Sequence, residues 1–455
     1  MLYKRYLIGL LGIYAVMALS ACNKYLDIAP KGFTTLTTVT NYDQWLNDAN
    51  KLGASATTEL NQLGDNVDNV NIILPATSSS NLVYLWAAQF TTDVKISPVF
   101  WGAHYANINS YNTVLEGVDK ATDGTEAMKR SLKAEALLGR AFEYFYLINL
   151  YGKPYDAATA ATDLGVPFVT SNDVSQKVPP RSTVKEVYDR MIADINAALP
   201  DLPKDNSKNR MRGSVQAAYS VLARIYLYMR NYTEASKNAQ LALQTAVPNT
   251  LTMIDYRIAI PVSIVSLSIR PDAIYARRLL GYEIPELAFM KTFDSKDLRL
   301  KVFYSGARTT RGTFTYGTLF TGNSGLSNTN TGTSLQEMKL IIAEAAARAG
   351  DVNTALGHLN DIRMMRFNTA DYQPLQSTDK DQILAWVFRE RSFELPYAGL
   401  RWFDMRRLDK ENRMPVVNRY NAQNSVIATL PQQAAAYTLQ IPNAVLLFNP
   451  EMPQN

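Results

Sequence analysis

The sequence predicts a mainly α-helical protein, in which tetratricopeptide-like helical repeats carry irregular loops and short strands. Three observations support this fold class. Segments with apolar residues at helical spacing dominate residues 98–246 and 334–407. Two helix–turn–helix segments with matching small residues follow one another along the chain. Between them, residues 250–333 carry β-branched runs and a tract rich in Gly, Thr, Asn and Ser, which is typical of irregular structure.

The helices can be placed in chain order from their caps and periodicity. Residues 41–52 are expected to form a short helix with Thr40 as N-cap, and the Asn-, Asp- and Ser-rich residues 61–80 a loop. A long helix is expected over residues 125–151, where Gly152 and Pro154 stop it. The remaining expected helices span residues 98–121, 183–198, 214–229, 232–246, 335–349, 352–366, 380–395 and 401–408.

The repeat shows in the spacing of alanines. Ala223 and Ala235 lie on either side of a turn, and Ala343 and Ala355 have the same separation across another turn. Small residues at these points would let antiparallel helices pack closely, as in tetratricopeptide-like repeats.

Composition excludes several classes of protein. Of 455 residues, 47% are hydrophobic, so the chain can bury a large core. The net charge of +5 comes from nearly even numbers of basic and acidic residues, which argues against nucleic acid as a partner. One Cys and two His exclude a Cys-rich zinc site and a disulfide framework within the chain. No cofactor is expected, and calcium stays a less favoured alternative: the oxygen-rich run at residues 65–69 could contact a cation but lacks the glycine and closing glutamate of a calcium loop.

The first residues predict export and lipid attachment. Lys4 and Arg5 precede an apolar stretch at residues 6–19, which is shorter than a membrane-spanning helix. The only cysteine of the chain, Cys22, follows Leu19-Ser20-Ala21, where a bacterial lipoprotein signal requires it. Residues 1–21 are therefore expected to be a signal peptide, and Cys22 to carry the lipid that anchors the chain to a membrane.

Two carboxylates one helical turn apart, Glu390 and Glu394, raise the alternative of glycosidase chemistry. They stand in an apolar helical surface where Arg and Glu alternate, which favours structural ion pairs over catalysis. We expect three glutamates to pair with arginines such as Arg363, Arg391 and Arg401. The glutamates are Glu344, Glu390 and Glu394.

Several motifs occur in one order along nearly the whole chain. They are Cys22 to Pro30, Trp101-x-x-x-Tyr105, Tyr151-Gly152-x-Pro154, Pro180 to Val184, Glu390-Arg391-x-x-Glu394-Leu395, Gly399-x-Arg401-Trp402-x-Asp404-x-x-Arg407, Ile441-Pro442, Asn449-Pro450 and Gln454-Asn455. With these motifs the chain resembles the SusD/RagB family of surface nutrient-binding lipoproteins. It departs from the family at Ala398, where a glutamate is frequent, and residues 250–333 match no specific family motif.

The resemblance implies one discontinuous SusD-like domain over residues 22–455. Its repeat helices would lie at about 98–246 and 334–407, and its variable segments at 33–97, 247–333 and 408–455. The implied role is to capture a nutrient, usually a glycan, on the surface of the outer membrane and to deliver it to a SusC-like TonB-dependent transporter. No catalysis is implied. A peptide-binding member of the same family remains an alternative, and a surface glycosidase a more distant one.

Sugar rings stack on aromatic side chains, and their hydroxyl groups need polar partners. Two irregular segments, residues 65–90 and 304–320, supply both kinds of side chain. We expect them to converge on one exposed face, with Trp86 as its platform. The candidate ligand-binding residues are Asn66, Asp68, Tyr84, Trp86, Arg311, Tyr316 and Phe320.

Overall fold

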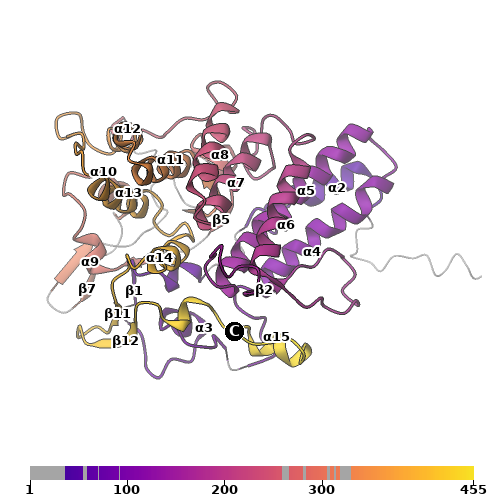
Figure 1. Cartoon of the computed structure of the whole chain (residues 1–455), viewed down its shortest axis with the longest axis horizontal. Coiled ribbons are helices and arrows are strands. Elements are labelled where there is room, and N and C mark those ends of the chain that lie inside the picture. Colours follow the sequence, from indigo (N-terminus) through magenta and orange to yellow (C-terminus); the bar gives the residue numbers. More distant parts are fainter. Residues whose placement is uncertain are drawn as a thin grey trace, which may run out of the picture.

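Long helices packed side by side form one half of the molecule, and short helices, hairpins and loops form the other (Figure 1). The computed structural model describes residues 36–54, 59–69, 71–91, 93–258, 266–279, 283–304, 308–311, 314–317 and 329–455. Within them the helices are α2 (Val39–Leu46), α3 (Ser79–Tyr84), α4 (Gly102–Gly117), α5 (Glu126–Tyr151), α6 (Val184–Ala198), α7 (Val215–Tyr228), α8 (Tyr232–Gln244), α9 (Leu287–Met290), α10 (Leu298–Phe303), α11 (Leu335–Ala349), α12 (Val352–Arg363), α13 (Lys380–Glu394), α14 (Arg401–Asp409) and α15 (Asn443–Phe448).

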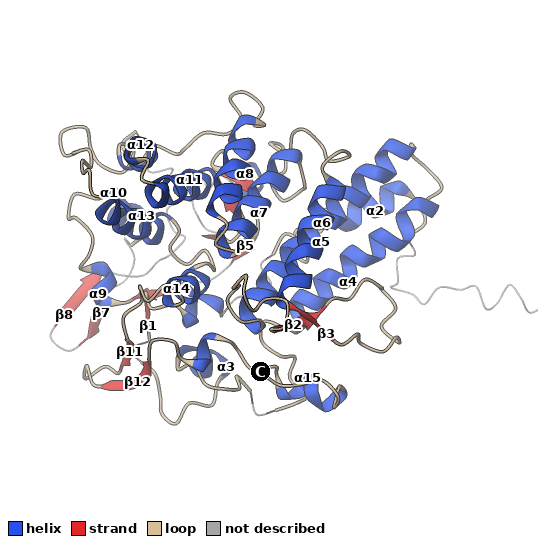
Figure 2. Cartoon of the chain, in the orientation of Figure 1, coloured by secondary structure: helices blue, strands red, loops and turns tan. Residues whose placement is uncertain are grey.

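Strands are short and scattered, as Figure 2 shows. In the part of the chain that the structure describes they form two-stranded antiparallel pairs, and a single parallel bridge joins Ala54 to Arg278. The pairs are β1 (Val67–Asp68) with β6 (Ile284–Pro285), β2 (Leu164–Pro167) with β3 (Arg181–Thr183), β4 (Ala273–Tyr275) with β10 (Thr333–Ser334), β5 (Arg278–Leu279) with β9 (Thr329–Asn330), β7 (Arg308–Arg311) with β8 (Phe314–Gly317), and β11 (Val417–Tyr420) with β12 (Val426–Leu430).

Side-chain caps fix where the helices begin. Thr125 caps α5, Ser214 caps α7 and Ser334 caps α11, each by accepting a hydrogen bond from a backbone N–H of the first turn. Thr183 and Glu186 form a reciprocal capping box at α6. The helix starts predicted at these four places are therefore confirmed to within a residue.

The first quarter of the chain differs from the prediction. The first helix begins at Val39 with Thr38, not Thr40, as its N-cap. The predicted loop at residues 61–80 instead contains a 3-10 turn at Leu60–Leu63 and ends in the first residues of α3. Helix α4 begins at Gly102 rather than at Pro98, because residues 98–101 form a turn that precedes it.

The predicted repeat is confirmed as two helix pairs. Helices α7 and α8 form one hairpin, α11 and α12 form the other, and α11 packs against α8. The four alanines that revealed the repeat are fully buried. Their small side chains let neighbouring helices approach closely, which is how such repeats stack. Helices α4, α5 and α6 extend this layer, because α5 packs against both of its neighbours.

A buried ion-pair network joins α13 to the segment around α10. Glu390 accepts hydrogen bonds from Arg363 at 2.7 Å and from Arg299 at 2.9 Å. Glu394 accepts from Arg366 at 2.6 Å and from Arg299 at 3.1 Å. Arg299 also binds Asp297, so three carboxylates face three guanidinium groups in this network.

A second network ties α14 to α11 and α13. Arg407 binds both oxygens of Glu344, at 2.5 and 2.8 Å, and Asp404 at 2.8 Å. Arg391 binds the other oxygen of Asp404 at 2.8 Å. The predicted pairing of Glu344, Glu390 and Glu394 with arginines is thus confirmed. Two of the suggested partners were wrong, because Arg391 pairs with Asp404 and Arg401 pairs with Asp65.

Acid should weaken this second network at a definite pH. Burial alone would raise the pKa of Asp404, but the charges of Arg391 and Arg407 outweigh it and lower the pKa from 3.8 to about 2. Because the pKa is lower in the folded state, the carboxylate stabilises the fold above about pH 4, and this contribution of about 2 kcal/mol is lost as the pH falls toward 2.

Urea unfolding from pH 7 to 2.5 measures this contribution when the wild type is compared with Asp404→Asn, whose amide does not titrate. The difference in unfolding free energy between the two proteins should shrink below pH 4. A difference that stays constant over this range would contradict the assignment.

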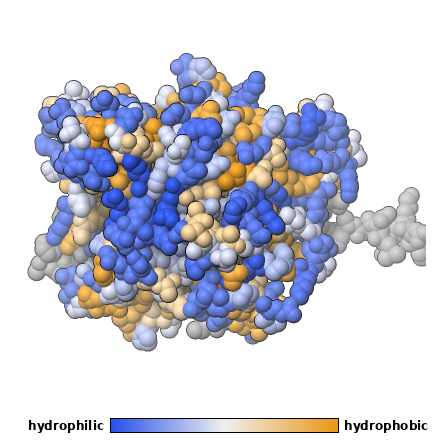
Figure 3. Space-filling view, in the orientation of Figure 1, coloured by the Kyte–Doolittle hydropathy of each residue, from blue (hydrophilic) through white to orange (hydrophobic). Residues whose placement is uncertain are grey.

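No helix in the described ranges is long and apolar enough to cross a membrane. Helix α5 spans 26 residues, but it carries charged side chains and packs between α4 and α6. Figure 3 shows mostly hydrophilic residues on the visible face, with smaller hydrophobic patches between them.

Candidate ligand-binding cavity

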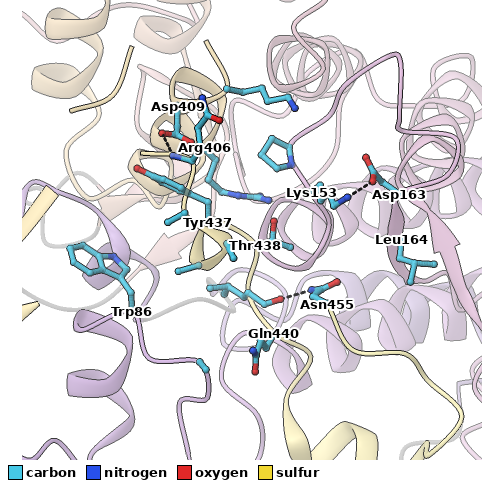
Figure 4. A pocket seen from close by; sticks show the side chains of 18 of the residues that line it. Trp86, Lys153, Asp163, Leu164, Arg406, Asp409, Tyr437, Thr438, Gln440 and Asn455 are labelled. Carbon is cyan, nitrogen blue, oxygen red and sulfur yellow. Dashed lines mark hydrogen bonds and ion pairs between the residues drawn. The ribbon is translucent and has the colours of Figure 1, made fainter. Parts of the chain in front are cut away.

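A cavity of about 930 Å³ lies where the C-terminal ends of α5 and α14 meet the last residues of the chain. Residues from five parts of the chain line it (Figure 4). They are residues 86–88 after α3, residues 153–154 and 162–164 between the end of α5 and the start of β2, three residues of the 406–410 segment at the end of α14, residues 433–440, and residues 454–455. These stretches are far apart in sequence, and the surrounding helices hold them together. The volume falls in the range of about 300–1,000 Å³ typical of small-molecule sites.

Trp86 forms part of one wall, and its position is fixed on two sides. Its indole N–H donates a hydrogen bond to the backbone oxygen of Leu63 at 3.0 Å. The guanidinium of Arg419 lies 4.2 Å from the ring centre of Trp86 and 4.2 Å from that of Tyr84. The backbone of Trp86 has a φ of 53°, a left-handed conformation that costs energy and is often found at binding sites.

Tyr437 supplies a second aromatic wall. Its ring stacks on Trp402, with ring centres 5.2 Å apart and planes at 24°. Its hydroxyl has no hydrogen-bond partner in the described part of the chain. Tyr437 is 3% exposed and its hydroxyl is buried, which raises the pKa of Tyr437 and keeps the hydroxyl protonated at neutral pH.

Amide side chains hold the C-terminal residues in the cavity wall. The side chain of Gln454 accepts a hydrogen bond from the N–H of Ile441 at 2.6 Å and donates one to its carbonyl at 2.8 Å. The Asn455 amide donates to the carbonyl of Tyr151, the last residue of α5, at 2.8 Å. Gln440 is exposed, and its side-chain oxygen accepts from Gln89 at 3.3 Å. The lining therefore offers amide and hydroxyl groups beside two aromatic rings.

Charged residues surround these groups. Lys153 pairs with Asp163 at 2.6 Å, and both line the cavity. Asp409, at the end of α14, accepts two hydrogen bonds from the backbone N–H of Gln433, at 2.9 and 3.0 Å. Arg406, one turn earlier on α14, completes this wall.

The structure buries all four candidates predicted in the first irregular segment. Asn66, Asp68 and Tyr84 are 3%, 3% and 1% exposed, and none of them lines the cavity. The Asn66 backbone oxygen accepts from Tyr397, and Asp68 accepts from Tyr84 at 3.4 Å, so all three serve the packing of β1 and α3. Trp86 lines the cavity but is only 8% exposed.

The expectation of an exposed platform at Trp86 was therefore wrong. The physical reason is Arg419 on β11, which covers the rings of Tyr84 and Trp86 from a distant part of the chain. The side chains of Arg311 on β7 and Tyr316 on β8 lie outside the described residues, as does Phe320. Their role in binding, and the convergence of the two segments, stay predictions.

Sequence reasoning missed the residues that contribute most to the cavity. Tyr437, Arg406 and Lys153 were not candidates, and the segment at 433–440 was assigned only to a variable region. One signal was available: Tyr437 is an aromatic residue in an otherwise Ala- and Gln-rich run at residues 432–440. Nothing local indicated that the ends of α5 and α14 would meet it.

The oxygen-rich run at residues 65–69 is engaged by protein partners. Arg401 binds both oxygens of Asp65 at 2.6 Å. Among the residues that the structure describes, no group of three or more His, Cys, Asp or Glu side chains could hold a metal ion.

Comparison with known proteins identifies the family. Residues 24–227 match a family model described as "Starch-binding associating with outer membrane", and residues 288–455 match the model described as "SusD family". The chain belongs to the SusD family. The two matches together cover most of the chain, including the helices and C-terminal residues that line the cavity.

Relatives and solved structures agree with this family. The SusD-like protein P2 of Formosa agariphila is 25% identical over 418 residues, which are 78% of this chain and 79% of that protein. A SusD superfamily protein from Bacteroides thetaiotaomicron has a TM-score of 0.73 at 19% identity, covering 92% of this chain and 100% of the other. Surface glycan-binding protein A from Bacteroides uniformis has a TM-score of 0.65 at 17% identity, covering 92% and 99%. These structures show that the SusD fold is the fold of this chain.

Proposed function

We propose that this protein binds a glycan in the cavity between the ends of α5 and α14 and delivers it to a SusC-like TonB-dependent transporter. The observation that carries the proposal is the lining of the cavity, which places Trp86 and Tyr437 beside amide and hydroxyl groups. The C–H faces of sugar rings can stack on aromatic rings. Side-chain amides can both donate hydrogen bonds to sugar hydroxyl groups and accept hydrogen bonds from them. The family description of starch binding, and the surface glycan-binding protein of similar fold, support a glycan over other ligands.

Two alternatives receive less support. A glycosidase needs two opposed carboxylates with access to a sugar, whereas Glu390 and Glu394 are buried and each binds two arginines. Neither lines the cavity, and we propose that the protein is not an enzyme. A peptide ligand would also use amide groups, and a combined glycan and peptide array decides between the two. Binding of peptides alone would overturn the glycan proposal.

Replacement of Trp86 tests the cavity directly. Trp86→Ala should weaken glycan binding by about 1–3 kcal/mol, because it removes one aromatic wall. Isothermal titration calorimetry with a glycan selected on the array measures the effect. Trp45→Ala is the matched control, since Trp45 lies outside the cavity and its indole also binds a backbone oxygen.

Trp86 also packs against Arg419, so its loss can affect stability. Gln440→Ala changes an exposed side chain of the same lining and should weaken binding without lowering the melting temperature. Unchanged affinity in both Trp86→Ala and Gln440→Ala would show that the ligand binds elsewhere.

We further propose that Cys22 carries a lipid that holds the protein on the outer membrane, facing outward. Cys22 lies outside the described residues, and the proposal rests on the sequence Leu19-Ser20-Ala21-Cys22 and on the family description of association with the outer membrane. Residues 23–35 would then tether the lipid to the first described residue, Leu36.

The repeat helices of residues 98–246 are proposed to face the transporter, because they present a broad packed surface, while the irregular segments face the ligand. Crosslinking in cells from Lys237 on α8 and from Lys301 on α10 would test this orientation. We expect transporter crosslinks from the first position and few from the second. The reverse pattern would contradict the proposed orientation.

A further inference from the structure

Arg406 is a buried cation in the wall of the cavity. Its side chain is 2% exposed, and Figure 4 shows its guanidinium directed toward the middle of the lining side chains. Its two terminal nitrogens donate hydrogen bonds to the backbone oxygens of Asn149 and Gly152, at the C-terminal end of α5. The remaining nitrogen, Nε, has no hydrogen-bond partner among the described residues. One donor of this buried guanidinium is thus left without a protein partner among the described residues.

No described carboxylate neutralises Arg406. Burial lowers the pKa of Arg406 to about 10, against a smaller raising effect of Tyr188, so Arg406 stays charged at neutral pH. Arg181 also donates to a carbonyl at the end of α5, and it too binds backbone and amide oxygens rather than a carboxylate. A helix end supplies about half a negative charge, which is less than the two guanidinium charges placed there. A buried charge without compensation is costly, so an anion in the cavity would be favoured.

The acidic side chains of the lining already have partners within the protein. Asp163 binds Lys153 at 2.6 Å and also accepts from Thr159, and Asp409 accepts two hydrogen bonds from the backbone of Gln433. At the rim, the Lys153 side chain is 65% exposed and the Lys410 side chain 45% exposed. Each already pairs with an aspartate, Lys153 with Asp163 at 2.6 Å and Lys410 with Asp156 at 3.2 Å, and each keeps enough exposed surface for a ligand to approach its ammonium group. The lining side chains thus include three cations and two carboxylates, with Asp156 beside Lys410 as a third carboxylate just outside the lining. None of these carboxylates forms an ion pair with Arg406, the buried cation.

We propose that the glycan bound here is acidic, and that its carboxylate or sulfate group lies against Arg406 with Lys153 and Lys410 at the rim. This inference rests on the proposed glycan-binding function and names the class of glycan. Hydrogen bonds between a guanidinium and an anion are about twice as strong as neutral ones, which gives the cavity a preference for a charged sugar over its neutral counterpart.

Matched pairs of ligands test the proposal. Calorimetry on the mature protein would compare an oligosaccharide of galacturonic acid with its methyl ester, and a sulfated galactan oligosaccharide with its desulfated form. At least one acidic ligand should bind about tenfold or more tightly than its neutral partner. This preference should weaken with added salt, because the rim lysines are exposed. Preferential binding of the uronic acid would identify the anion as a carboxylate, and preferential binding of the sulfated sugar would identify it as a sulfate.

Variants at the rim complete the test, because replacing Arg406 would also uncap α5. Lys153→Gln and Lys410→Gln should each reduce the preference for the acidic ligand, while Lys237→Gln, an exposed lysine on α8, should leave it unchanged. Equal binding of acidic and neutral sugars would overturn this inference and leave the glycan-binding function intact. An array on which acidic peptides but no sugars bind would overturn both.

Discussion

Replacing Glu390 by Ala should destabilise the protein by about 3–5 kcal/mol, the cost of removing one partner from a buried ion pair. Glu390 is fully buried and binds Arg299 and Arg363. Three carboxylates accept hydrogen bonds from three guanidinium groups in this network, and Arg389 lies 3.9 Å from Glu390, so loss of Glu390 leaves an uncompensated positive charge in the core. Urea or thermal unfolding measures the effect, and the melting temperature should fall by several degrees.

Asp189→Ala provides the matched control. Asp189 pairs with Lys185 on the surface of α6, and both side chains are about half exposed, so this change should cost no more than about 1 kcal/mol. A Glu390→Ala protein with an unchanged melting temperature and lost ligand binding would overturn the structural assignment and return Glu390 to the list of functional candidates.

Replacing Cys22 by Ala should release the protein from the membrane. Each buried methylene group contributes about 0.8 kcal/mol to membrane binding, so two or more acyl chains hold a protein stably on the membrane. A protein that loses these chains should leave the membrane. No described helix could span a membrane in their place. Fractionation of cells that lack the transporter partner should move the variant to the soluble fraction, while the wild type stays with the outer membrane.

The control for this experiment is Ser20→Thr, which alters the same signal segment but keeps the cysteine. A Cys22→Ala variant that stays with the membrane in cells without the transporter would show that the anchor lies elsewhere. Protease treatment of intact cells distinguishes the orientations, because a surface-facing protein is digested and a periplasmic one is protected.

Local signals predicted most of the helical layer. Caps such as Thr125, Thr183 and Ser214 place helix starts by hydrogen bonding within a single turn, so they can be read from a few residues. The alanine spacing revealed the repeat for a similar reason: each pair of alanines lies within one helical hairpin, so the pattern is contained in a short stretch of sequence. The exact arginine partners could not be read, since Arg401 pairs with Asp65 from the other end of the chain.

The candidate site was predicted less well than the fold. Trp86 was identified by its residue type and its irregular segment, but its burial depends on Arg419, more than 300 residues later. Tyr437 and Arg406 join the cavity only because the last residues of the chain fold against the end of α5. Such contacts follow from tertiary packing, which no local pattern encodes.

A crystal structure of the protein with the oligosaccharide that binds most tightly on a glycan array tests the central claim most directly. The ligand should occupy the cavity between Trp86, Tyr437 and Arg406, with sugar hydroxyl groups within hydrogen-bond distance of the amides at residues 433–440. A sugar bound away from this cavity, for example against the β7–β8 hairpin, would contradict it.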